Sequence, residues 1–129
     1  MTFKGLMTAA ALLAIPAGAA AHHSFAVFFD EEKAVRITGK VTAFRFTNPH
    51  GTIAMDVIGN DGKVHKWRVE TNAPVVLQRR GWTRASVRPG QTVTVEGWQA
   101  RDGKPYIRLR RALDADGKPI GQAFGAHED

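Results

Sequence analysis

Stretches of alternating apolar and polar residues are the feature that most limits how this chain can fold. A period of two is typical of strands that bury one face. Glycine, asparagine and aspartate separate the stretches, as in Asn60-Asp61-Gly62 and Arg101-Asp102-Gly103, and such residues favour tight turns. The pattern therefore predicts a mainly β chain whose strands cover residues 35–46, 53–57, 64–70, 92–98 and 106–113.

One short helix interrupts this series of strands. Pro74 suits an early helical position, residues 75–80 form the body, and Gly81 ends it, with Thr71 or Asn72 as the cap. The helix falls between the third and fourth strands. This order predicts a small five-stranded OB-fold-like barrel, with a five-stranded open sandwich as the alternative. Gly39 and a shift in the apolar pattern after it predict a bulge in the first strand.

The N-terminus has the features of an export signal. Lys4 provides a positive charge, residues 6–15 are an apolar run, and Ala19 and Ala21 are small residues before a cleavage site. The run is shorter than the about 20 residues of a membrane-spanning helix. We expect cleavage after Ala20 or Ala21, which gives a signal peptide over 1–21 and one domain over 22–129.

The export signal indicates where the protein is located, and the composition of the last residues indicates whether they are ordered. We expect a periplasmic or secreted protein with no transmembrane anchor after signal removal. Residues from about 121 are rich in glycine and polar side chains, so we expect a frayed tail. The sequence leaves the oligomeric state open.

Composition narrows the range of partners. The chain has 129 residues, no cysteine and a formal charge of +6, which becomes +5 when Lys4 leaves with the signal. Without cysteine, a disulfide, a thiolate metal site and a cysteine nucleophile are excluded. A basic surface favours anionic partners. Export makes nucleic acid a poor candidate, so no nucleic-acid partner is expected.

Several motifs of the chain resemble a known family. They are His22-His23-Ser24-Phe25, Thr47-Asn48-Pro49-His50, Leu77-x-Arg79-Arg80-Gly81-Trp82-Thr83, Pro89-Gly90 and Val93-x-Val95-x-Gly97. In this order they are similar to the small exported bacterial proteins of domain-of-unknown-function family 6152. The resemblance implies export and a small β-rich fold, and it implies no activity.

The histidines form the first candidate site. If cleavage follows Ala21, the mature chain begins with His22, whose amine and imidazole can chelate one metal ion. His50, in a proline-containing turn, is the candidate distant ligand, and His23 is the alternative. Cleavage after Ala20 places His23 third, where amine, backbone amides and imidazole can surround the ion. Both arrangements suit Cu(II), whereas a closed zinc site needs four ligands.

Basic and aromatic residues form the second candidate site. An OB-type barrel binds oligomers through basic and aromatic groups on its strands. The candidates for such a face, which would take an anionic saccharide or a partner protein, are Tyr106, Arg108, Arg110, Arg79 and Arg80. The alternative is a solvated surface on which arginine stems cover apolar groups.

The sequence gives little support for an enzymatic function. Ser24 and Ser86 are the only serines, and neither lies in a nucleophile elbow. No pair of carboxylates can be assigned to one cleft. We therefore predict a non-enzymatic exported binding protein. Its preferred partner is a metal ion, Cu(II), bound at His22, His23 and His50. The alternative partner is a periplasmic molecule bound on the basic face.

Overall fold

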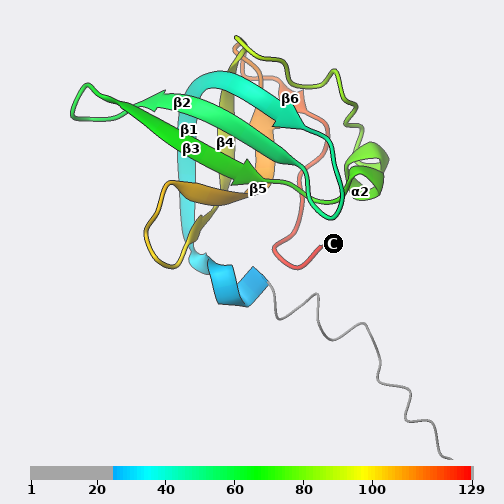
Figure 1. Ribbon diagram of the computed structural model, residues 1–129. Helices are drawn as coiled ribbons and strands as arrows, with labels where there is room; N and C mark the ends of the chain where they lie inside the picture. The colour runs from blue at the N-terminus through cyan, green and yellow to red at the C-terminus, as the bar shows by residue number, and fades with distance from the viewer. Residues whose placement is uncertain (1–24, 129) are drawn as a thin grey trace, which may run out of the picture.

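The computed structural model describes residues 25–128 (Figure 1). Residues 25–28 are helical and lead into a long first strand. Within the described part of the chain, the elements are β1 (Phe29–Arg45), β2 (Thr52–Ile58), β3 (Val64–Glu70), α2 (Pro74–Arg79), β4 (Thr92–Ala100), β5 (Tyr106–Leu113) and β6 (Pro119–Ile120). The prediction of a mainly β chain with a short helix between the third and fourth strands is confirmed.

The strands form one sheet in the order β3-β2-β1-β4-β5-β6. β3 also pairs with β5 in parallel, whereas the other pairs are antiparallel. Hydrogen bonding therefore runs in a ring through β1, β2, β3, β5, β4 and back to β1. The two-residue strand β6 extends β5, so the described residues contain six strands where the sequence predicted five.

Strand β1 is the element that joins the two sides of the ring. Its first part pairs with β4, and its second part pairs with β2. A Cβ on Gly39 would overlap the carbonyl oxygen of Asp56, so a glycine permits this close approach to β2. The predicted bulge is present between Val41 and Ala43. It turns Ala43 away from the core face that Val41 occupies.

The core lies inside the ring. Alternate residues of β2, β4 and β5 are fully or nearly fully buried, as their alternation predicted, and Trp82 and Leu77 close one end. The alternating residues are Ile53, Met55, Val57, Val93, Val95, Ile107 and Leu109. Apolar burial of this kind is the main favourable contribution to folding.

Two parts of the chain differ from the sequence-based expectation. The residue before α2 is Ala73, without a side-chain cap, while Thr71 and Asn72 are fully buried and bond elsewhere. The expected frayed tail instead packs on the domain: Phe124 is 3% exposed, and its ring lies 6.5 Å from that of Trp82. Apolar burial of one aromatic residue explains why a polar tail is held in place. Within the described residues, no helix is long and apolar enough to cross a membrane.

Candidate functional site

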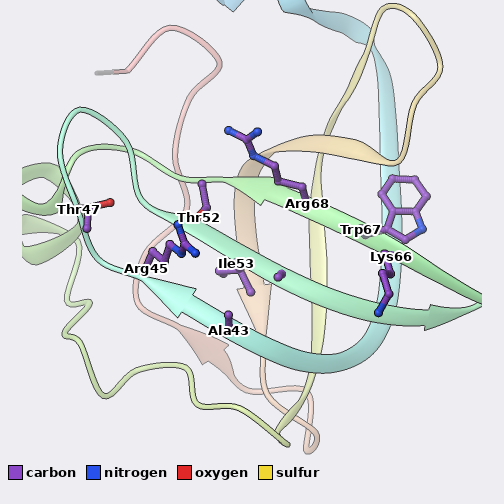
Figure 2. Close-up of a pocket in the computed structure, with 9 residues that line it drawn as sticks. Ala43, Arg45, Thr47, Thr52, Ile53, Lys66, Trp67 and Arg68 are labelled. Atoms are coloured by element: carbon purple, nitrogen blue, oxygen red, sulfur yellow. The ribbon is translucent and has the colours of Figure 1, made fainter.

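An open trough lies on the outer face of β1, β2 and β3 (Figure 2). Because side chains alternate along a strand, Thr52, Ala54 and Asp56 of β2 point outward. Thr52 and Ala54 line the trough. The bulge in β1 adds Ala43 and Arg45 to the same face. Small side chains thus form the floor of a depression of about 580 Å³.

Cationic side chains border this trough on both sides. Arg45 extends from β1, whereas Lys66 and Arg68 extend from β3 (Figure 2). With β2 between them, the two flanking strands lie about 10 Å apart. The sides of the trough can therefore contact different anionic groups of one extended ligand.

The charges of the trough are only partly neutralised. The Lys66 ammonium lies 3.3 Å from the Asp56 carboxylate. The Arg68 guanidinium lies 4.8 Å from the centre of the Tyr106 ring, a contact that leaves its full positive charge in place. Within residues 25–128, neither Arg45 nor Arg68 forms an ion pair. The trough therefore presents net positive charge to solvent.

The sequence reasoning missed this trough. Lys66 and Arg68 alternate on β3 with the half-buried Trp67, and small residues follow one another at outward positions of β2. That combination is a detectable signal for a basic depression. This signal can be interpreted only when the strand register is known, because the register sets Ala54 opposite both Ala43 and Arg68.

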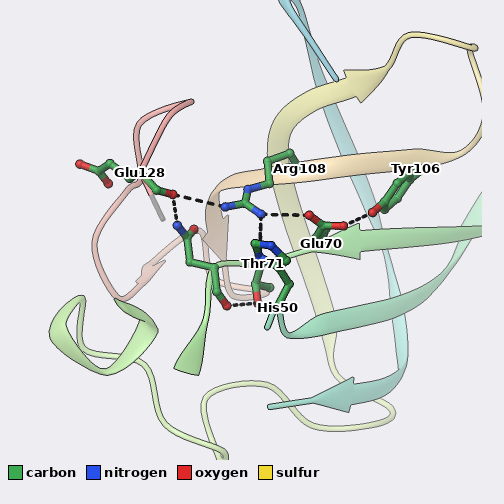
Figure 3. Close-up of polar contacts among 7 residues, drawn as sticks. His50, Glu70, Thr71, Tyr106, Arg108 and Glu128 are labelled. Atoms are coloured by element: carbon green, nitrogen blue, oxygen red, sulfur yellow. Dashed lines mark hydrogen bonds and ion pairs between the residues drawn. The ribbon is translucent and has the colours of Figure 1, made fainter. Parts of the chain in front are cut away.

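A second polar cluster surrounds Arg108, where β5 runs parallel to β3 (Figure 3). Arg108 is 4% exposed, and its Nη1 donates to the Glu70 carboxylate at 3.0 Å. The Tyr106 hydroxyl donates to the other oxygen of Glu70. Burial and the adjacent Glu70 raise the pKa of Tyr106, so its phenol stays protonated as a donor.

His50 belongs to this cluster. Its Nδ1 lies 3.1 Å from Nη1 of Arg108 and 3.2 Å from the Thr71 carbonyl oxygen. A metal ion on Nδ1 would therefore meet the positive guanidinium directly. His22 and His23, the other predicted metal ligands, lie outside the described residues. Within residues 25–128, no group of three or more His, Asp or Glu side chains is arranged to hold a metal ion.

The residues predicted for a basic face are separated by the structure. Arg79 and Arg110 are exposed, whereas Arg80 is half-buried and lies 2.6 Å from the Glu128 carboxylate. Arg108 is buried and paired with Glu70, and Tyr106 is half-buried. Arg108 faces outward on β5, as the alternation of side chains along the strand predicted, but the C-terminal segment covers it.

Comparison with known proteins gives one family match. The model of a family described as a family of unknown function, DUF6152, matches residues 10–107. No curated protein matches the chain.

One similar solved structure is a crystal structure of TiaS in complex with an isoleucine tRNA and ATP. The alignment has 18% sequence identity and a TM-score of 0.48, and it covers 66% of this chain and 18% of that chain. Similarity at this level carries no information on function.

Proposed function

The chain belongs to the DUF6152 family, whose function is unknown, and we propose that it is an exported, non-enzymatic binding protein. Its ligand is an anionic oligosaccharide held in the trough of β1, β2 and β3. The observation that carries this proposal is the pair Arg45 and Arg68 on opposite sides of the trough, two guanidinium groups that have no acidic partner among residues 25–128.

An OB-type barrel is the fold we propose for this module. The ring of strand pairing, the parallel contact of β3 with β5 and the helix between β3 and β4 all support it. OB folds bind oligosaccharides and oligonucleotides on the face of strands 2 and 3. The trough lies on the corresponding strands of this chain, and β6 is an addition at the edge.

The chemistry of the trough favours a saccharide over other anions. Thr47 and Thr52 offer hydroxyls that can exchange hydrogen bonds with sugar hydroxyls. Arg45 and Arg68 suit carboxylate or sulfate groups, which accept two parallel hydrogen bonds from a guanidinium. The N-terminal sequence predicts export, and an exported protein meets polysaccharides more readily than nucleic acid.

The contacts of the nearby carboxylates also support the proposal that the protein binds its ligand without catalysis. Glu70 is engaged by both Arg108 and Tyr106, and Asp56 faces Lys66. Neither carboxylate is free to act as a general acid or base in the present arrangement. A bound saccharide is therefore expected to leave unchanged.

Calorimetric titration with hexagalacturonate, a carboxylated saccharide, tests this function. The double variant Arg45→Ala/Arg68→Ala should weaken binding at least about tenfold, since each charge-assisted hydrogen bond contributes roughly 1.5–3 kcal/mol. The charge-matched control is Arg88→Ala/Lys118→Ala, which changes two exposed residues outside the trough. Equal losses in both variants, or no binding by the native protein, would overturn the proposal.

Cu(II) binding by the N-terminal histidines is a second proposal, favoured by one contact of the C-terminal segment. The ring of His127 lies 5.2 Å from that of Phe25. His22 and His23 precede Phe25 by three and two residues, and three residues span at most about 10 Å. The imidazole of His127 is therefore within reach of the predicted N-terminal chelate.

A competitive Cu(II) titration of the exported protein, with its N-terminus verified by mass, tests this second proposal. Adding one residue before the first histidine should abolish sub-nanomolar affinity, which corresponds to more than about 12 kcal/mol. His50→Ala and His127→Ala identify the distant ligand. Micromolar binding that ignores the added residue would exclude the copper site.

A further inference from the structure

A second depression, which we term the mouth pocket, lies at the end of the core that the β2–β3 and β4–β5 turns border. Its volume is about 400 Å³. Besides glycines of the two turns, it is lined by Ile37, Val57, Asn60, His65, Trp67 and Pro105. Small-molecule sites commonly have this size and a mostly apolar wall with a few polar groups. The mouth pocket can therefore hold a small ligand or one unit of a longer one.

Trp67 forms the boundary between the mouth pocket and the trough. It lines both depressions, and it lies at the same end of the trough as Lys66 (Figure 2). Part of its side chain packs against the core. Its Nε1 forms no hydrogen bond within residues 25–128 and, unlike Nε1 of Trp82, is not buried. Trp67 therefore offers an apolar ring together with a free hydrogen-bond donor.

Polar side chains lie at the rim of the mouth pocket. Asn60, in the β2–β3 turn, is exposed, and its side-chain amide forms no hydrogen bond within residues 25–128. Nε2 of His65 lies 2.9 Å from the Asp61 carboxylate, and a neutral imidazole that donates from Nε2 keeps an acceptor at Nδ1. Gly59 leaves room for this ring, because a Cβ there would lie 2.6 Å from a ring carbon. The rim therefore offers both donors and acceptors, as hydroxyl groups require.

The mouth pocket differs from the trough in charge. Among the described residues, no lysine or arginine lines it, whereas Arg45, Lys66 and Arg68 border the trough. A carboxylate inside the mouth pocket would lose hydration without gaining a lysine or arginine partner, which is costly. The mouth pocket therefore favours an uncharged ring that carries hydroxyls.

A ligand can pass from the trough to the mouth pocket over one edge of β3. This strand pairs with β2 along residues 64–70, but with β5 only along residues 68–70. Within the described chain, residues 64–67 therefore have no strand on their second side. Trp67 lies in this stretch, directly before Arg68 of the trough. One extended ligand can therefore occupy both depressions.

We propose that the mouth pocket is a subsite for an uncharged sugar residue, held by Trp67 and Asn60, so that the ligand is a polysaccharide with neutral and acidic residues in one chain. The inference rests on the saccharide-binding function proposed above and names its substrate class. Because the neutral residue is linked to an acidic residue in the trough, its effective concentration is in the millimolar range. A subsite that is weak by itself therefore still adds to the affinity.

Neutral methyl glycosides test the mouth pocket without the trough. At millimolar concentration, at least one of the methyl glycosides of glucose, galactose, mannose and N-acetylglucosamine should shift the NMR signal of the Trp67 indole N–H. Trp67→Phe assigns this signal. Asn60→Ala should reduce the response severalfold, whereas Gln78→Ala, which removes an exposed amide of α2, should not. No response of Trp67 to any glycoside, or an equal response of the buried Trp82, would overturn the neutral subsite.

Oligosaccharides test whether one chain occupies both depressions. Hyaluronan hexasaccharide, in which glucuronate alternates with N-acetylglucosamine, should bind severalfold more tightly than hexagalacturonate, although it carries fewer carboxylates. The double variant Asn60→Ala/Trp67→Phe should remove most of this preference and leave the affinity for hexagalacturonate unchanged. Absence of hexagalacturonate binding with the glycoside response retained would overturn the function of the trough alone. Equal affinities of the native protein for the two oligosaccharides, or a preference that survives the double variant, would overturn the inference.

Discussion

Nη1 of Arg108 and Oε1 of Glu70 lie 3.0 Å apart, and the side chains are only 5% and 17% exposed. The parallel pairing of β3 with β5 sets the two residues opposite each other. A buried charge is tolerated only with a partner. This contact therefore ties the closure of the strand ring to a specific pair of charges.

Loss of the acidic partner should be strongly destabilising. We expect Glu70→Ala to lower the free energy of unfolding by about 3 kcal/mol, because it removes the carboxylate that bonds the buried Arg108 guanidinium. Urea denaturation followed by tryptophan fluorescence measures this change. Asp56→Ala, which breaks the exposed contact with Lys66, is the matched control and should cost at most about 1 kcal/mol. Similar costs for the two variants would contradict the importance of burial.

Gly39 allows β1 to approach β2 closely, so a larger residue should disturb the ring. A Cβ at this position would overlap the Asp56 carbonyl oxygen and would lie 2.9 Å from a methyl carbon of Val57. We expect Gly39→Ala to cost about 1–3 kcal/mol, as overpacked sites do. Lys40→Ala, at the exposed neighbour, should have little effect. Thermal unfolding of both variants checks the expectation, and unchanged stability of Gly39→Ala would disprove the tight approach.

Local patterns were sufficient to predict most of the strands. The bounds predicted for β3 and β5 agree with the structure, because residues alternate along both strands and a glycine turn precedes each of them. β1 begins at Phe29, earlier than predicted, since residues 30–33 are polar and give no alternating signal. Their strand conformation follows from the chain around them, which a local pattern does not encode.

The candidate sites could be predicted less well, for a related reason. The trough depends on the register between Ala43 and Ala54, which the bulge in β1 sets. Burial of Arg108 depends on a tail more than ten residues away in sequence. Both are tertiary effects, and the local hint in the sequence is Phe124, an aromatic residue in an otherwise polar tail.

Glu96 should make the stability of the protein depend on acid pH. A hydrogen bond from Arg111 holds the pKa of Glu96 below its ordinary value of 4.5, and Arg36 lies 2.9 Å away as well. The folded state therefore keeps this carboxylate charged at a pH where the unfolded state binds a proton. The contribution is fully present above 4.5 and is lost as pH falls below it.

The variant Glu96→Gln isolates this contribution. The native protein should exceed the variant in stability at neutral pH, and the difference should shrink as the pH falls below 4.5. Urea denaturation at a series of pH values gives both curves. A difference that stays constant with pH would show that the glutamine acts by packing and not by charge.

Phe124 provides the sharpest test of the packed C-terminal segment. Its side chain is 3% exposed, lies against Trp82 and has the Arg80 guanidinium 5.9 Å from its ring centre. Deleting a buried phenylalanine side chain costs about 3–5 kcal/mol when the site cannot collapse. We therefore expect Phe124→Ala to cost about 3 kcal/mol in chemical denaturation. Gln122→Ala, which removes an exposed side chain of the same segment, is the control and should change stability by less than about 0.5 kcal/mol. A tail that frays in solution would give the same small effect for both variants.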